Sequence, residues 1–242
     1  MSSYPTFRYF GEHSVLLEWR DKIDEEIHRE LIQWKEFIEE IYRDEIIEIA
    51  PSYNALAVFL RPGIPKDVFI DKLRKAVVKR DLIPPKSPKL ISIPVCYDDE
   101  FGIDLKALAR LHQLSISEVI EIHSQKIYKT YFIGFLPGFP YLAGLDQRLH
   151  TPRKVAPRRF IEAGSVGIGS SQTGVYPGNY PGGWNIIGRT PLKLFDATRD
   201  QPSLIRAGDL IKFVPVSKTT YRLIEIEINT GTYKMEEEVY ND

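Results

Sequence analysis

In the N-terminal part of the chain, apolar positions recur with two different periods, which predict strands and helices in alternation. Five short runs rich in apolar residues have the length of strands: residues 6–10, 14–19, 45–50, 55–60 and 90–95. Between the second and third runs, Asp24 is positioned to cap a helix that continues to about Arg43. The apolar positions of that helix follow helical spacing and define one buried face: Ile27, Leu31, Trp34, Ile38 and Ile41. A second helix begins near Pro65, because proline is favoured in the first turn of a helix.

The resulting order is β-β-α-β-β-α-β, and removal of the first strand leaves the split β-α-β arrangement of a ferredoxin-like sandwich. The segment 84–88, Pro-Pro-Lys-Ser-Pro, cannot be helical and has the composition of a stiff linker. We therefore place a domain boundary near residue 88, which gives one domain over residues 1–88 and another over residues 89–242. The strand at 90–95 lies beside this boundary, and its sequence is compatible with either domain.

Two short helical patterns, at residues 104–112 and 115–124, open the second domain. Ser115 and Glu118 have the spacing of a capping box at the start of the second helix. Strand-like runs separated by Gly and Pro turns then follow: KIYKTYFIG, RRFIEAG, SVGIG, WNIIG, LKLF and DLIKFV. Many short strands with turns between them predict a closed or nearly closed β-barrel. The tail YRLIEIEINTGTYKMEEEV has strand propensity.

Residues 132–189 contain most of the glycines, many prolines and a dense set of aromatic residues and arginines. Gly and Pro recur too often there for an ordinary helix. The aromatic content is too high for a disordered linker. We therefore expect short strands and tight turns that fix side chains around a surface, where binding and catalysis concentrate.

Two segments of this stretch carry a family resemblance: FIGFLPGFPYLAGLDQRLHTPR and AGSVGIGSSQTGVYPGNYPGGWNIIGRTPLKLF. With GEHSVLLEW near the start and IPVCYDDEFGIDLKALA in the middle, they resemble the family of the 5-oxoprolinase B subunit, also called allophanate hydrolase subunit 1. The resemblance covers nearly the whole chain. The same family contains the Kip-type inhibitors of sporulation histidine kinases, and it resembles part of urea carboxylase.

The resemblance implies an α+β fold, in which an N-terminal ferredoxin-like α/β sandwich is followed by a C-terminal cyclophilin-like β-barrel. It allows a helix at residues 218–226 of the tail. It also implies a component of an ATP-dependent 5-oxoprolinase, a cyclic amide hydrolase that is active only in complex. The C subunit of 5-oxoprolinase would share the phosphoryl-transfer half with this chain, and the A subunit would complete hydrolysis of the lactam to glutamate. The alternatives are a protein-binding inhibitor of a histidine kinase and a carboxyltransferase-like subunit.

Composition indicates which binding partners and which cellular compartment fit the chain. The 32 basic and 33 acidic residues give a net charge of −1, so the chain has no overall electrostatic field that favours binding to nucleic acid or to a membrane surface. The single cysteine, Cys96, excludes an internal disulfide framework and fits a reducing cytoplasm. The N-terminus lacks a signal-peptide pattern, and no apolar run approaches the ~20 residues of a transmembrane helix. We expect a cytoplasmic component of a hetero-oligomer. Because the chain has no P-loop, ATP would be bound in the complex.

Four arginines are candidates for binding a carboxylate or a phosphate, because guanidinium presents a planar fork that fits either group: Arg153, Arg158, Arg159 and Arg189. Arg153 and Arg158 lie in proline-flanked turns, which restrict where their side chains point. Together with Arg189, they also fall on positions that match the family motifs. We assign these three to substrate binding; the alternative for each is solvated surface charge.

The glycine-rich run at residues 164–171 could cradle an anion with its amides, but its spacing fits neither a dinucleotide fingerprint nor a P-loop. The alternative is a strand whose glycines allow close backbone approach. Gln172, polar among small residues, is a better ligand candidate. Tyr176, Gly183 and Trp184 join the substrate-binding set, since large amphipathic rings beside a rigid Pro-Gly bend can form the rim of a site. A purely structural corner is the alternative.

His123 is the candidate catalytic residue. It precedes the predicted barrel at a family-matching position and would transfer protons near neutral pH. The alternative is a histidine at a helix end with a structural hydrogen bond. The five histidines have no metal-ligand spacing, so we predict no metal site. The lack of a G-x-S-x-G elbow argues against a serine hydrolase, and the acidic second helix of LKALARLHQLSISEVIEIHS argues against DNA binding.

Overall fold

The computed structural model describes residues 5–21, 24–79 and 87–240. The chain forms two compact units, Met1–Lys86 and Ser87–Asp242. Most of the predicted linker at 84–88 lies outside the described residues. Within the described part of the chain, no helix is long and apolar enough to cross a membrane.

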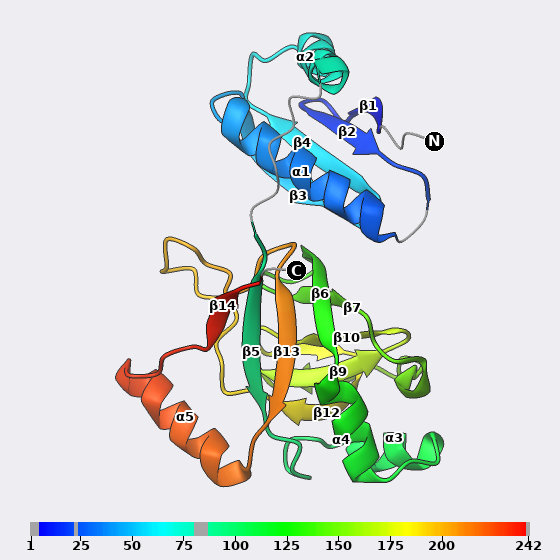
Figure 1. Cartoon of the computed structure of the whole chain (residues 1–242), viewed down its shortest axis with the longest axis vertical. Helices are drawn as coiled ribbons and strands as arrows, with labels where there is room; N and C mark the ends of the chain where they lie inside the picture. Colours follow the sequence, from blue (N-terminus) through cyan, green and yellow to red (C-terminus); the bar gives the residue numbers. More distant parts are fainter. Residues whose placement is uncertain (1–4, 22–23, 80–86, 241–242) are drawn as a thin grey trace. The chain divides into compact units, whose positions relative to one another are not determined.

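Unit 1 is a four-stranded antiparallel sheet with two helices (Figure 1). The strands are β1 (Thr6–Phe10), β2 (Ser14–Glu18), β3 (Ile46–Pro51) and β4 (Ala55–Leu60), in the order β1-β2-β4-β3. The helices are α1 (Glu25–Ile41) and α2 (Lys66–Lys79). All four strands and both helices occur where the periodicity of the sequence predicts them.

The core of unit 1 lies between the sheet and α1. The Asp24 carboxylate accepts a hydrogen bond from the Glu26 amide at 2.9 Å, which caps α1 as predicted. The predicted apolar stripe of α1 is buried from Ile27 to Ile38, whereas Ile41 at its last turn is exposed. Side chains of β4 alternate, with Leu56, Val58 and Leu60 facing the core.

The ferredoxin-like sandwich is not confirmed, because its last strand is in the other unit. The strand predicted at 90–95 is β5 (Lys89–Val95), which belongs to the large sheet of unit 2. In unit 1, β1 pairs along β2 from Thr6 to Phe10 and forms that edge of the sheet. The choice that the sequence left open for this strand is therefore settled in favour of the C-terminal unit.

Unit 2 is built on an eight-stranded mixed sheet in the order β12-β9-β10-β7-β6-β13-β5-β14. Its strands are β5, β6 (Ile127–Ile133), β7 (Pro140–Ala143), β9 (Ser165–Gly169), β10 (Gln172–Val175), β12 (Asn185–Arg189), β13 (Leu210–Pro215) and β14 (Glu237–Val239). A separate two-stranded sheet joins β8 (Arg158–Ile161) to β11 (Tyr180–Gly182). The β13–β5 pair is parallel, and the other pairs of the large sheet are antiparallel.

The predicted closed β-barrel is not found among the described residues, which corrects the cyclophilin-like part of the prediction. The large sheet ends at β12 on one side and at β14 on the other. A backbone contact joins the β5 side of the sheet to its β12 edge. Cys96, directly after β5, forms an isolated antiparallel bridge with Arg189 at the end of β12. The two backbone hydrogen bonds of this bridge measure 2.9 and 3.0 Å. The α+β class is confirmed.

Helices cover parts of this sheet. They are α3 (Leu105–Leu111), α4 (Ile116–Gln125) and α5 (Lys218–Thr230), with a short 3-10 turn, η1 (Gln147–Leu149). The capping box at α4 is confirmed, because Ser115 and Glu118 exchange side-chain and backbone hydrogen bonds. The tail forms both of the structures that the sequence left open. Helix α5 covers the residues at which the family resemblance allowed a helix, and the strand β14 follows it. LKLF forms only an isolated bridge, at Phe195, and is not the predicted strand.

Candidate functional site

Trp184 is the centre of an aromatic cluster beside the β9–β10 hairpin. It directly precedes β12, and its side chain is only 4% exposed. Its ring meets Phe139 edge to face at a centroid distance of 5.4 Å and Tyr176 at 6.4 Å. Ile161 and Ile186 complete the buried cluster. We call these five residues the Trp184 cluster. Two of the predicted site residues, Tyr176 and Trp184, are therefore core residues of the unit.

Glycines of the β9–β10 hairpin create the space for the indole. A Cβ added at Gly169 would lie 2.5 Å from Trp184 Nε1, and one at Gly174 would lie 3.2 Å from the same ring. Gly182 has a similar role, since its Cβ would lie 2.2 Å from the Tyr176 hydroxyl. The glycines of this run thus let the backbone approach the rings closely. This is the role that the sequence analysis gave as the alternative to binding an anion.

Arg153 covers the exposed side of the cluster. Its guanidinium carbon lies 5.7 Å from the centre of the Trp184 ring, within the range of a cation–π contact. Arg153 is exposed, whereas the neighbouring Lys154 and Arg158 are half-buried. The predicted site residue Gly183 holds this loop in place, because its carbonyl accepts a hydrogen bond from the Lys154 amide at 2.7 Å.

Arg158 is engaged by a carboxylate that sequence reasoning missed. Its two terminal nitrogens donate to the two oxygens of Asp104 at 2.8 and 2.7 Å. Lys154 Nζ lies 2.8 Å from the same carboxylate, and the Ile186 amide of β12 donates to it at 2.8 Å. Asp104 is buried and joins the start of α3, the loop before β8 and β12 in one network.

Electrostatics favour the charged form of Asp104. Burial opposes ionisation, but the hydrogen bonds from Arg158, Lys154 and the Ile186 amide outweigh it and hold the pKa of the carboxyl below its usual value. In the sequence, Asp104 stands at the cap position of a helix, but its side chain makes no capping hydrogen bond. No local pattern distinguishes it from an ordinary capping residue, so sequence reasoning had no signal for this contact.

The network limits what Arg158 can bind. Both terminal nitrogens already donate to Asp104, so the end-on fork is not available to a substrate carboxylate or phosphate in this arrangement. Arg153, which is exposed, keeps that capacity. Gln172 is half-buried at the start of β10, opposite Gly169. Arg159 is exposed on β8.

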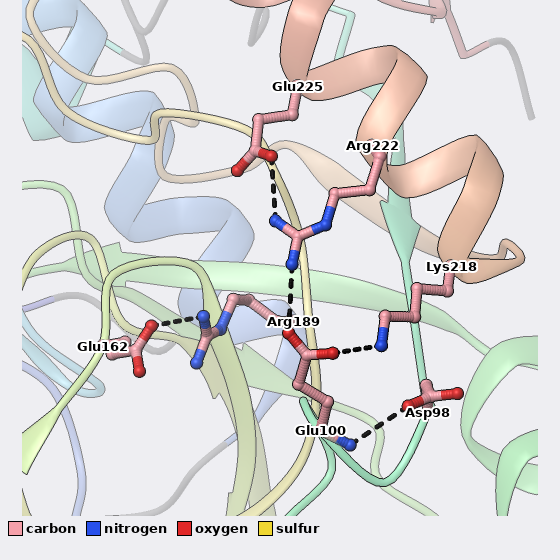
Figure 2. A network of polar contacts seen from close by, with 7 residues as sticks. All are labelled: Asp98, Glu100, Glu162, Arg189, Lys218, Arg222 and Glu225. Atoms are coloured by element: carbon pink, nitrogen blue, oxygen red, sulfur yellow. Dashed lines mark hydrogen bonds and ion pairs between the residues drawn. The ribbon is translucent and has the colours of Figure 1, made fainter.

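Arg189 occupies a different place from the other candidates. It ends β12 and forms an ion pair with Glu162 (Figure 2). Its guanidinium carbon lies 5.2 Å from the centre of the Phe101 ring. It lines a cavity of about 280 Å³ together with residues of the β8–β9 turn, the segment after β12 and α5. The structure thus divides the predicted set between the Trp184 cluster and this cavity.

His123 is fully buried in the core of unit 2. Its Nδ1 lies 2.8 Å from the Tyr97 hydroxyl and its Nε2 lies 2.9 Å from Thr173 Oγ1. The ring stacks on Phe213 at 4.6 Å. Burial lowers the pKa of His123 to about 3, which keeps the ring neutral. These contacts are those expected of a histidine with a structural role, and they do not present the ring to a substrate.

The tautomer of His123 follows from its neighbours. The Thr173 hydroxyl donates to the Gly167 carbonyl at 3.1 Å, so it accepts from the imidazole. His123 Nε2 therefore carries the proton, and Nδ1 accepts from Tyr97. Elsewhere among the described residues, no group of three or more His, Cys, Asp or Glu side chains could hold a metal ion.

Comparison with known proteins places the chain in a family. The family model of the carboxyltransferase domain, subdomain C and D, matches residues 5–205. The chain belongs to this family. It is 38% identical over 241 residues to the B subunit of 5-oxoprolinase from Bacillus subtilis, covering 93% of this chain and 100% of that protein. The Escherichia coli O157:H7 protein of the same name is 45% identical over 173 residues, which cover 70% of this chain and 78% of that protein. The resemblance to the 5-oxoprolinase B subunit is thus confirmed.

Solved structures show the same fold within longer chains. The structure of TTHA0988 superposes with a TM-score of 0.75 at 30% identity, covering 84% of this chain and 40% of that protein. Urea carboxylase of Kluyveromyces lactis superposes with a TM-score of 0.72 over 98% of this chain and 24% of that protein. At 19% identity the second similarity concerns the fold alone. In both cases, the present chain corresponds to less than half of the larger protein.

Proposed function

We propose that this chain is the B subunit of an ATP-dependent 5-oxoprolinase and acts with the C and A subunits of that enzyme. The observation that carries the proposal is the 38% identity to a protein of that name over the whole length of that protein. The C subunit would complete the phosphoryl-transfer site, and the A subunit would complete the conversion of 5-oxoproline to glutamate. ATP would be bound in the complex, in the cytoplasm.

The chemistry explains why such a site needs fixed cations. A lactam carbonyl resists attack by water, and phosphorylation of its oxygen creates a better electrophile. The transferring phosphoryl group carries negative charge that positioned guanidinium and ammonium groups stabilise. Arg153 is exposed above Trp184, and Lys154 is held beside it by Asp104. Of these two side chains, Arg153 is the cation available to a substrate beside the Trp184 cluster, because Lys154 is paired with the buried Asp104.

Exposed apolar side chains support a partner at this surface. Phe135 is 78% exposed and contacts Phe139 of the Trp184 cluster edge to face at 6.5 Å. Val155, in the loop that carries Arg153, and Phe160 of β8 are also exposed. A contiguous exposed apolar patch rimmed by polar residues is typical of a protein–protein contact surface. We therefore assign this surface to the contact with the C subunit.

Reconstitution tests the proposal. The purified chain alone is expected to show no 5-oxoproline-dependent ATP hydrolysis, and addition of the C and A subunits is expected to produce it. In the reconstituted enzyme, Arg153→Ala should lower kcat by about 10² to 10³, the scale for loss of one charge-stabilising donor. Arg148→Ala, which removes an exposed arginine paired with Asp146, is the matched control and should change little. Equal turnover by the isolated chain would refute the shared site.

A carboxyltransferase-like role is the second candidate. It is supported by the family model and by the fold similarity to urea carboxylase. The same reconstituted complex separates the two functions, because carboxyl transfer requires bicarbonate and 5-oxoproline hydrolysis does not. ATP hydrolysis that depends on bicarbonate, with transfer of its ¹³C label to an amide, would favour the second role. The kinase-inhibitor interpretation stays a prediction.

A further inference from the structure

The cavity at Arg189 is formed by residues other than those of the Trp184 cluster. Its volume is about 280 Å³, enough for a molecule of amino-acid size. Its charged and polar lining includes Glu162, Arg189, Thr190, Lys193, Tyr221 and Glu225. Small-molecule sites commonly combine a concave wall with a few fixed polar groups. Only the groups that are not already paired within the protein are available to a ligand.

Aromatic packing fixes the position of Arg189. The guanidinium lies over Phe101, which is buried and stacks against Tyr221 at a centroid distance of 4.5 Å. Arg222 approaches the same Phe101 ring at 5.5 Å. The backbone of Arg189 is held as well, by the two hydrogen bonds to Cys96. The cation is therefore preorganised at the wall of the cavity, with its side chain 18% exposed.

The hydrogen-bonding capacity of this guanidinium is not fully used. Its Nη1 donates to Glu162, whose side chain is 54% exposed and comes from the turn after β8. Its buried Nε has no acceptor among the residues that the structure describes. A buried N–H without a partner is costly, so this nitrogen favours an additional acceptor.

The other charges at the cavity are engaged elsewhere. Glu225 accepts from Arg222 at 3.0 Å, and Lys193 donates to Asp196 at 2.9 Å. Figure 2 shows Arg222 between Glu225 and Glu100, while Arg189 faces Glu162 alone among the residues drawn. Arg189 is thus the cation whose partner is an exposed and replaceable carboxylate.

We propose that this cavity binds a small carboxylic acid, with Arg189 as the anchor of its carboxylate. The ligand carboxylate displaces Glu162 and accepts from the guanidinium in its place, and a side-on approach also satisfies Nε. Thr190 and Tyr221 also line the cavity, and both are largely buried in its wall. The site lies outside the Trp184 cluster. The choice of 5-oxoproline and L-glutamate as probes rests on the proposed function.

Titration calorimetry on the isolated full chain tests the ligand class. Saturable binding of 5-oxoproline or L-glutamate is expected, and the stronger of the two identifies which carboxylate the site prefers. The control ligand is 2-pyrrolidinone, which keeps the lactam ring and lacks the carboxylate. It should bind at least about tenfold more weakly, the loss expected for one charged hydrogen-bonded contact. Equal affinity for 2-pyrrolidinone, or no binding of either acid, would overturn the proposal.

Two variants test the anchor from opposite directions. Arg189→Gln should weaken binding about tenfold to a hundredfold. Glu162→Gln removes the internal competitor and should strengthen binding several-fold, an effect that a purely structural ion pair would not produce. Arg148→Gln is the matched control and should leave affinity unchanged. If Arg189→Gln fails to fold, Glu162→Gln still decides: unchanged or weaker binding there contradicts the assignment.

Amide and indole NMR signals locate the ligand. The amides of Gly164 and Thr190, which line the cavity, should shift on titration, whereas the indole of Trp184 should not. Shifts confined to Trp184 would place the ligand at the other surface and refute this site. The proposed function is tested separately by turnover of the complex. Binding without turnover in the complex would leave the cavity assignment standing and reject the function; turnover without binding would do the reverse.

Discussion

At the level of single residues, His123 shows how burial changes the meaning of a titratable side chain. The sequence offers a histidine at a helix end, which is compatible with proton transfer and with a structural role. The structure surrounds the ring with Tyr97, Thr173 and Phe213 and leaves it neutral. Its two hydrogen-bond partners are distant in sequence, so no local pattern could have revealed them.

The pH dependence of stability tests this role of His123. Between about pH 6.5 and the folded pKa of about 3, the unfolded chain binds a proton that the folded core excludes. Stability should therefore fall as pH falls through this window. Urea unfolding of His123→Gln should show a smaller loss across the same range. The exposed His13→Gln variant is the control, and an identical pH profile for His123→Gln and the parent chain would contradict the buried neutral assignment.

Asp104 is the residue whose removal should be most informative for the Trp184 surface. Asp104→Asn leaves Arg158 and Lys154 without their carboxylate and should cost roughly 2–4 kcal/mol, because removing one partner of a largely buried ion pair strands the other charges. Since the folded pKa is depressed, this stabilisation is present above the usual pKa of 3.8 and is lost as pH falls below it. Urea unfolding at neutral and acidic pH measures both effects.

The control for Asp104 is Asp99→Asn. Asp99 pairs with Lys106, and both side chains are more than half exposed, so its removal should cost less than about 1 kcal/mol. A loss of similar size in the two variants would show that the Asp104 network contributes no more than a surface ion pair.

At the level of elements, the β9–β10 hairpin and Trp184 form one packing unit. Gly169→Ala places a methyl group against the indole and should destabilise by roughly 1–3 kcal/mol, the usual cost of overpacking. Trp184→Ala should cost roughly 3–5 kcal/mol by leaving a cavity. Gly134→Ala is the control, because its Cβ would make only ordinary contacts, the nearest at 3.7 Å. Thermal unfolding compares the three, and equal melting temperatures for Gly169→Ala and Gly134→Ala would refute the close contact.

The elements that the sequence predicted well are those with a strong local signal. Helix α1 has a capping aspartate and a regular apolar face, and α4 has a capping box. LKLF has the alternation of a strand, but its pairing stops at the single bridge between Phe195 and Ser203. The prediction of a closed barrel failed for a related reason: closure depends on which distant strands pair, and periodicity does not encode that.

At the level of the whole molecule, the division into two units gives a test that needs no partner. Limited proteolysis should release a stable C-terminal fragment that begins within or directly after the segment 84–88, because that segment has linker composition and β5 starts at Lys89. Mass spectrometry of the products identifies the cut. Cleavage scattered through β6 to β13, with no protected fragment, would contradict independent folding of unit 2.

The candidate site was predictable only in part. Matches to the family motifs pointed to Arg153 and Arg189, and a large ring beside a Pro-Gly bend pointed to Trp184. In the structure Arg153 is exposed over the buried Trp184, and Arg189 lines the cavity. Arg189 is separated from Trp184 although both belong to one short motif, because five residues along a strand reach opposite ends of it. The binding partner of Arg158 was also hidden, since Asp104 lies 54 positions away.

The position of β5 in the sheet has a consequence for synthesis of the chain. Its neighbours are β13 and β14, which are made more than a hundred residues later. Until residues 210–215 have emerged from the ribosome, the apolar segment LISIPV has unpaired edges on both sides. Pairings between segments so far apart form slowly, and exposed apolar strands associate with one another meanwhile. Chaperones should therefore bind the nascent chains that stall before β13, and the same chains should be the ones that aggregate.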